Sequence, residues 1–173
     1  MAEGARLIRG LAVLAVVLVT VGCDRVTKNA ASEYLAGRPP LSLAADSIHL
    51  EYVENRGGFL GLGAHLPAPA RTATFTVGTA IILVWLGLWV VRRALAGGWI
   101  MGPALLWAGG VANLADRIVL GRVVDFINLG LGGLRTGIFN AADVAITLGV
   151  LLVVLELAQA RLAQQSPCRR TRG

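Results

Sequence analysis

Lysine, histidine and cysteine are all scarce in this chain of 173 residues, which contains a single lysine, two histidines and two cysteines. The sequence has neither an HExxH motif nor a cluster of Cys and His, the usual ligands of catalytic zinc, so we expect no metal and no cofactor. Cys23 ends an apolar stretch and Cys168 lies near the C-terminus. We expect them on opposite faces of a membrane, where they cannot form a disulfide.

Charged residues are also few. They make up 15% of the chain, against about 25% in soluble domains, while 55% of the residues are hydrophobic and the mean hydropathy is +0.69. The net charge of +6 is not gathered into a basic stripe with interleaved aromatic residues, which excludes nucleic acid as the expected partner. The composition indicates a membrane protein.

A transmembrane helix needs about 20 mostly apolar residues. Four such segments are present, at about residues 7–23, 73–91, 99–115 and 138–160. We therefore predict an all-α membrane protein, a bundle of four transmembrane helices forming one domain over residues 1–165, followed by a basic cytoplasmic tail over residues 166–173. Eight basic residues are concentrated in the short segments before the first span, between the second and third, and after the fourth. The positive-inside rule then places both termini in the cytoplasm.

Two segments are expected on the outer side. In residues 29–72, apolar and polar residues alternate from Ile48 to Val53, which predicts a strand, and Gly57-Gly58 predicts a turn. We expect this segment to form a small β-sheet on the outer membrane surface, with His49 and His65 in solvated loops. Residues 118–139 are predicted to form a short interfacial or re-entrant element.

Polar residues gather where the predicted spans meet the outer face. These residues are Asp24 and Lys28 on the first span, Asn113, Asp116 and Arg117 on the third, and Asn140 and Asp143 on the fourth, with Asp125 just before them. Spacings of three and four place each set on one helix face. Ionisable groups at membrane depth are costly and usually face the interior of a bundle, so a shared site is expected.

Paired carboxylates supply a chemistry for this site. Two carboxylates held close together cannot both ionise cheaply, so the pair shares a proton. The ionised partner can activate water while the protonated one polarises a carbonyl or protonates a leaving amine, which is what peptide hydrolysis requires. We predict that Asp125 and Asp143 are this pair. Asp116, with Arg117 beside it, is better suited to an ion pair or a scaffold role.

Five motifs occur in a fixed order along the chain. They are Asp24-Arg25-Val26-Thr27-Lys28, Glu54-Asn55-Arg56-Gly57-Gly58-Phe59, Gly109-Gly110-Val111-Ala112-Asn113-Leu114-Ala115-Asp116-Arg117, Val123-Val124-Asp125-Phe126-Ile127 and Phe139-Asn140-Ala141-Ala142-Asp143. Together they resemble the motif set of the lipoprotein signal peptidase (signal peptidase II) family, over roughly residues 7–160.

This resemblance implies a multi-pass aspartyl protease of the bacterial inner membrane, with its active site near the outer face. Such an enzyme removes the signal peptide from prolipoproteins by cutting before a cysteine that carries diacylglycerol, so the implied partners are this substrate and membrane lipid, and the protein is taken to be a monomer. The catalytic dyad would be Asp125 and Asp143. The other implied site residues shape the site, hold the substrate backbone or support the outer pocket; they are Asp24, Lys28, Asn55, Gly57, Asn113, Asp116, Arg117 and Asn140.

Three other interpretations remain open at this point. A small proton-coupled transporter or channel would also use buried Asp, Asn and Arg, although its polar residues should cross the full membrane depth. A serine–lysine protease could use Ser32 and Lys28, which are four residues apart. The chain could itself be a lipoprotein modified at Cys23, but cleavage there would remove the first span.

Overall fold

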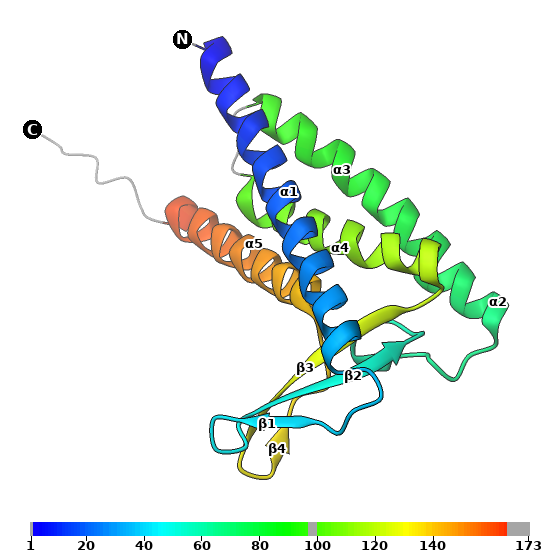
Figure 1. Ribbon diagram of the computed structural model, residues 1–173. Helices are drawn as coiled ribbons and strands as arrows, with labels where there is room; N and C mark the ends of the chain where they lie inside the picture. The colour runs from blue at the N-terminus through cyan, green and yellow to red at the C-terminus, as the bar shows by residue number, and fades with distance from the viewer. Residues whose placement is uncertain (1, 97–99, 166–173) are drawn as a thin grey trace, which may run out of the picture.

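The structure, a computed structural model, describes residues 2–96 and 100–165 and consists of long helices with a small antiparallel sheet at one end (Figure 1). The helical elements are α1 (Ala2–Tyr34), the 3-10 helix η1 (Phe59–Gly61), α2 (Ala68–Arg71), the π-helix η2 (Thr72–Gly78), α3 (Thr79–Ala96), α4 (Met101–Leu120) and α5 (Ala141–Gln165). The strands are β1 (Leu41–Leu43), β2 (Ile48–Asn55), β3 (Val123–Leu131) and β4 (Leu134–Arg135). The predicted tail with Cys168, and Trp99 of the predicted third span, lie outside the described residues.

Three of the described helical stretches are long and apolar enough to cross a membrane, namely Glu3–Tyr34, Ala68–Ala96 and Ala141–Ala163. They coincide with the first, second and fourth predicted spans. The third predicted span forms α4, whose 20 residues give a length of about 30 Å, but α4 is not apolar enough to belong to this group. The count of four spans therefore stays a prediction.

The composition of α4 follows from its central position, since it packs against α1, α3 and α5. Small residues dominate its buried positions. They are Gly102, Pro103, Ala104, Ala108, Gly109, Gly110 and Ala112, with Asn113 and Asp116. Small side chains let helices approach closely, and a helix enclosed by other helices does not need the large apolar side chains that face lipid.

The contact between α4 and α5 is close enough to require glycine at Gly149. A Cβ atom there would lie 2.6 Å from the backbone nitrogen of Leu106 and 2.7 Å from the carbonyl oxygen of Gly102. We expect Gly149→Ala to push α4 and α5 apart and to lower the midpoint of thermal unfolding in detergent, at a cost of about 1–3 kcal/mol. Gly10→Ala is the matched control, because a Cβ on Gly10 meets nothing within 4 Å. Equal unfolding midpoints for the two variants would contradict this account.

The sheet closes the end of the bundle opposite to where α1 begins and α5 ends (Figure 1). Its order is β1-β2-β3-β4, with neighbouring strands antiparallel. The alternating pattern around Ile48 correctly predicted β2. The prediction for residues 118–139 was wrong, because this segment supplies β3 and β4. β3 starts with four consecutive buried residues, Val123 to Phe126, so it shows no alternation, and a strand covered on both faces has this pattern.

Two helix boundaries differ from the prediction. α1 continues beyond Cys23 to Tyr34, so Asp24 and Lys28 lie on one face of this helix, as their spacing of four predicted. α5 begins at Ala141 rather than near residue 138, because Phe139 pairs with Ile127 of β3 through two backbone hydrogen bonds of 2.9 Å. This pairing ties the start of α5 to the sheet.

The two histidines differ in their environment. His65 lies in an exposed turn as predicted. His49 does not lie in a loop, because it is part of β2, where its Nε2 is 2.6 Å from Asp46 Oδ1 and 3.0 Å from Arg135 Nη2. These contacts connect the β1–β2 turn to β4 at the outer edge of the sheet, away from the buried polar residues described next.

Candidate active site

Buried polar side chains meet where α1, α4 and the start of α5 adjoin the sheet. The structure brings all ten predicted site residues into one hydrogen-bonded cluster. The buried members are Asp24, Lys28, Asn55, Gly57, Asn113, Asp116, Asp125, Asn140 and Asp143, and Arg117 is half-buried. Buried polar groups are normally hydrogen-bonded, and the contacts below satisfy most of these atoms; among the described residues of the cluster, Asp116 Oδ1 and Arg117 Nε have no hydrogen-bond partner.

Asp125 lies on β3 opposite Val53 of β2. Both carboxylate oxygens accept hydrogen bonds from side-chain amides, Oδ2 from Asn55 Nδ2 at 2.8 Å and Oδ1 from Asn140 Nδ2 at 2.6 Å. Asn55 is two residues from Val53 along β2, so its side chain projects from the same face of the sheet as Asp125. Burial raises the pKa of the Asp125 carboxyl above its usual 3.8, although both amide hydrogen bonds act in the opposite direction.

Asp143 is positioned by the N-terminal cap of α5. The side chain of Asn140 accepts a hydrogen bond from the backbone N–H of Asp143 at 3.0 Å, and Asp143 Oδ2 accepts one from the backbone N–H of Asn140 at 3.3 Å. This reciprocal pattern is a capping box. A third cap comes from α1, where Asp24 Oδ1 accepts from the N–H of Ala142 at 2.9 Å. Asn140 therefore precedes the helix, and does not share a helix face with Asp143 as the spacing suggested.

Two asparagines connect the candidate carboxylates. Asn140 contacts both, through its side-chain amide to Asp125 and its backbone N–H to Asp143. Asn113 of α4 donates from Nδ2 to Asp143 Oδ1 at 2.9 Å, and its Oδ1 accepts from Asn140 at 3.2 Å and from Lys28 Nζ at 2.9 Å. The amides thus hold Asp125 and Asp143 around one shared partner, Asn140.

The only lysine forms a separate cationic centre. Lys28 Nζ lies 2.7 Å from Asp24 Oδ2, 2.7 Å from Asp116 Oδ2 and 2.9 Å from Asn113 Oδ1. An ammonium group has three donor hydrogens, so these contacts use all of them. Ser32 instead donates its hydroxyl to the carbonyl of Lys28 at 2.9 Å. Lys28 therefore serves as the counter-ion of two carboxylates, and the geometry does not support a serine–lysine pair.

The four buried aspartates consequently fall into two chemical groups. Asp24 and Asp116 have cationic partners, with Arg25 Nη2 also 3.0 Å from Asp116 Oδ1. Asp125 and Asp143 are held by neutral amide donors. Neutral donors fix the orientation of a carboxylate while still allowing it to take up a proton.

The ion pair expected between Asp116 and Arg117 does not form. Neighbouring residues on a helix point in different directions, so Asp116 faces Lys28 whereas Arg117 Nη2 donates to the carbonyl of Gly57 at 2.8 Å. The N–H of Gly57 donates in turn to Asn55 Oδ1 at 2.9 Å. A Cβ on Gly57 would be 2.8 Å from the backbone nitrogen of Ala64, so only glycine fits against the turn formed by residues 61–64.

A cavity of about 230 Å³ adjoins Asp125 and gives access to this cluster. Its lining includes Asn55, Leu60 and Ile138, so the carboxylate can be reached from the loop that follows β2. Sequence reasoning missed two contributors near the site, namely Arg25, the second partner of Asp116, and the buried Asn128, whose Nδ2 donates to the carbonyl of Thr136 at 2.9 Å. Arg25 meets Asp116 of the distant helix α4, which no local pattern shows. The contact of Asn128 depends on how β3 turns into β4, since its partner Thr136 follows eight residues later.

Helices of membrane length, a sheet closing one end and two buried, amide-held aspartates define a membrane-embedded protein with a site suited to acid–base chemistry. A family model described as signal peptidase (SPase) II matches residues 16–159. The chain belongs to the signal peptidase II family, a family of bacterial membrane proteases.

Individual relatives and solved structures agree with this assignment. A lipoprotein signal peptidase of Chlorobium phaeobacteroides is 35% identical over 146 residues, covering 79% of this chain and 84% of the relative. One from Brevibacillus brevis is 33% identical over 141 residues, covering 80% of this chain and 89% of the relative. The fold is similar to that of a bacterial membrane enzyme solved by the in meso method at 2.3 Å, with a TM-score of 0.75, 24% identity and coverage of 90% of this chain and 92% of that one. A second such enzyme, solved at 1.9 Å, gives a TM-score of 0.73 at 26% identity, over 84% of this chain and 92% of that one.

Proposed function

We propose that this protein is an aspartyl endopeptidase that removes the signal peptide from diacylglyceryl-modified prolipoproteins, cutting before the lipidated cysteine. The observation that carries the proposal is the pair Asp125 and Asp143, both buried and both bonded to Asn140. Relatives named lipoprotein signal peptidase support the choice of substrate.

In this proposal one aspartate is ionised and takes a proton from the attacking water. The other is protonated, polarises the scissile carbonyl and then donates its proton to the leaving amine. The pair titrates as a unit, so the resting proton belongs to both. Asn55, Asn113 and Asn140 orient the carboxylates, and Lys28, tied to Asp24 and Asp116, holds α1 against α4.

We further propose that α4 also crosses the membrane, as the third of four spans, that both termini are cytoplasmic and that the site lies near the outer face, in a single domain over residues 1–165 that acts as a monomer. The basic residues flanking the helix ends support this orientation. The substrate then enters laterally, with its acyl chains in the lipid and its scissile bond at the sheet end of the bundle.

A transporter would need polar groups along the whole path. The buried polar residues of the described chain instead come from the sheet and from the parts of the helices beside it. The unbroken course of α1 through the exposed Cys23 also argues against cleavage of this chain at that cysteine. A one-sided cluster fits an enzyme site better than a conduction path.

The testing experiment is a gel-shift cleavage assay with purified protein in detergent. The substrate is a diacylglyceryl-modified preprolipoprotein, compared with the same polypeptide without lipid. We expect cleavage of the lipidated form alone, unaffected by a chelator or by serine-directed reagents. Equal cleavage of both forms would overturn the substrate assignment, and failure of a folded sample to cleave either, with ion flux in liposomes, would favour the transporter.

The pH dependence of cleavage tests the buried pair separately. Burial raises the pKa of Asp125 above 3.8, so its carboxyl takes up a proton at a higher pH than a free aspartate. A dyad with both acids protonated has no base, and we expect kcat/KM to fall as the pH is lowered, with a midpoint above about 4.

The raised pKa of Asp125 also predicts that its protonation does not destabilise the folded protein. The acid inactivation should therefore not be caused by unfolding that follows protonation of Asp125. A carboxyl whose pKa is raised by folding contributes stability that is fully present below its unfolded pKa and is lost as the pH rises through its folded pKa. Thermal unfolding should be followed over the same pH range. Activity that stays constant down to pH 3.8, the ordinary value, would contradict the assignment of Asp125 as part of the base.

A further inference from the structure

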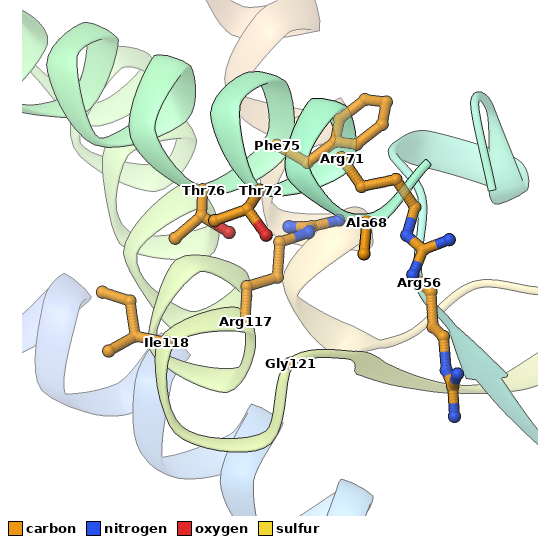
Figure 2. A pocket seen from close by; sticks show the side chains of 9 residues that line it. All are labelled: Arg56, Ala68, Arg71, Thr72, Phe75, Thr76, Arg117, Ile118 and Gly121. Atoms are coloured by element: carbon orange, nitrogen blue, oxygen red, sulfur yellow. The ribbon is translucent and has the colours of Figure 1, made fainter. Parts of the chain in front are cut away.

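A second cavity, of about 420 Å³, lies beside the proposed site, between the helical stretch α2–η2 and the end of α4. Three arginines line it, Arg56, Arg71 and Arg117, together with Thr72 and Thr76. Figure 2 shows the side chains of Arg117, Thr72 and Thr76 pointing toward one another, with Arg71 and Arg56 along the other edge. No acidic residue is among the described lining residues, so the cavity is strongly positive.

The positive charge of this cavity is only partly compensated within the protein. Arg71 Nη1 donates to the carbonyl oxygens of Leu66 at 2.8 Å and Ala64 at 3.3 Å, which are neutral groups. Arg117 bonds to the carbonyls of Gly57 and Asn113, and its Nε is buried without a hydrogen-bond partner among the described residues. Of the ion pairs formed by the described residues, none includes Arg71 or Arg117.

Backbone carbonyls therefore fix Arg71 and Arg117 in place and leave their other guanidinium donors available. Arg56 has an acidic neighbour, with its Nη2 4.0 Å from Glu54 Oε2. Several guanidinium groups with a preset orientation are typical of sites that bind phosphate, because each offers paired N–H donors to the phosphate oxygens. Threonine hydroxyls on the same side add further donors.

The remaining lining residues are apolar and point to a lipid. Ala68, Phe75, Ile118 and Gly121 complete the lining. Phe75 is drawn near Arg71, whereas Ile118, which is 64% exposed, lies on the side opposite Arg56 (Figure 2). The stretch Ala68–Ala96 that forms one wall is long and apolar enough to cross a membrane. The arginine side of the cavity is therefore at the end of a membrane helix, where headgroups lie, and the apolar side continues toward the acyl chains.

We propose that this cavity binds the phosphate of an anionic phospholipid, with Arg56, Arg71 and Arg117 around the headgroup and the glycerol end on the side of the exposed Ile118. This goes beyond the proposed function, because the diacylglyceryl group of the proposed substrate carries no phosphate. The lipid site shares Arg56 with the cavity that leads to Asp125. A bound phospholipid thus forms part of the wall next to the site where the signal peptide is cut.

The test is lipid binding to the intact purified protein, measured by native mass spectrometry from detergent with titrated phosphatidylglycerol. Diacylglycerol, which lacks the phosphate, and inorganic phosphate are the comparison ligands. We expect phosphatidylglycerol to bind at least about tenfold more tightly than diacylglycerol, and the double variant Arg56→Gln/Arg71→Gln to lose about tenfold in affinity, the effect of about one charge-assisted hydrogen bond. Arg38→Gln is the matched control. Arg38 is an exposed arginine that follows α1 and does not line the cavity, so this variant should bind like the wild type.

Two outcomes would overturn the proposal. Unchanged phosphatidylglycerol binding in the double variant would show that the lipid binds elsewhere. Inorganic phosphate that displaces phosphatidylglycerol at similar concentration would assign the cavity to a free anion. Because Arg71 also holds the loop at Ala64 and Leu66, its loss can disturb folding. Arg56→Glu alone is therefore a second variant, since the Arg56 side chain is 58% exposed. It should weaken binding at least as much as Arg56→Gln. The readout does not involve cleavage, so its failure is distinct from failure of the proposed function.

Discussion

Asp125→Asn and Asp143→Asn are each expected to reduce prolipoprotein cleavage by roughly 10²–10⁴-fold, the usual contribution of general acid–base catalysis. Each substitution removes a group that can exchange a proton with water or with the leaving amine, while nearly keeping the size of the side chain. The measurement is initial rate in the gel-shift assay with diacylglyceryl-modified substrate. Folding of each variant is checked by its elution and its thermal unfolding in detergent.

Each variant has a control of the same chemistry. Glu156→Gln changes an acid of α5 outside the polar cluster into its amide, and Asp46→Asn does the same on the exposed edge of the sheet. Both controls should retain nearly full activity. The dyad assignment would be wrong if a folded Asp125→Asn or Asp143→Asn variant kept more than a few per cent of wild-type activity.

Lys28→Met is expected to cost about 3–5 kcal/mol of stability and to reduce the yield of folded protein sharply. The change leaves Asp24 and Asp116 buried without their shared cation, and an unpaired buried charge is strongly destabilising. Asp116→Asn should also lose folded yield together with activity, because it breaks the same centre. Thermal unfolding in detergent, followed by tryptophan fluorescence, measures both effects.

Arg25→Gln is the matched control for this centre. Arg25 also contacts Asp116, but its side chain is 46% exposed, so its loss should cost at most about 1 kcal/mol. A triple variant, Lys28→Met with Asp24→Asn and Asp116→Asn, removes the unpaired charges and should recover part of the lost stability. If Lys28→Met unfolded at the wild-type temperature, or if Asp116→Asn folded normally but were inactive, the structural role proposed for this centre would be wrong.

Local sequence patterns were sufficient for the helices and for eight of the ten members of the polar cluster, whereas Asn55 and Gly57 were predicted from the family resemblance. Apolar runs of about 20 residues identify helices of membrane length, whatever surrounds them. The expense of polar and ionisable groups at membrane depth selected Asp24, Lys28, Asn113 and Asp143 as residues that need partners, and the structure buries all four in one cluster. The strand around Ile48 was also predictable, because apolar and polar residues alternate there.

The sequence could not supply the partners. Asp116 and Arg117 are adjacent in the chain but face different neighbours, and the strand β3 gave no alternating signal because both of its faces are covered. The cap that positions Asp143 combines Asn140 with Asp24. Asp24 accepts a hydrogen bond from the backbone N–H of Ala142, which is 118 positions further along the chain. Contacts of this kind depend on how helices and strands pack, which no local pattern records.

The sequence by itself therefore determined that this is a helical membrane protein, which residues form its polar cluster and which family it resembles. Only the tertiary structure decided how those residues divide. It gives Asp24 and Asp116 a cation, and Asp125 and Asp143 neutral amides. The physical reason is that the tendency of a carboxylate to hold a proton depends on the charges and donors within a few ångströms of it, and in this protein those groups come from α1, β2, α4 and the residue before α5.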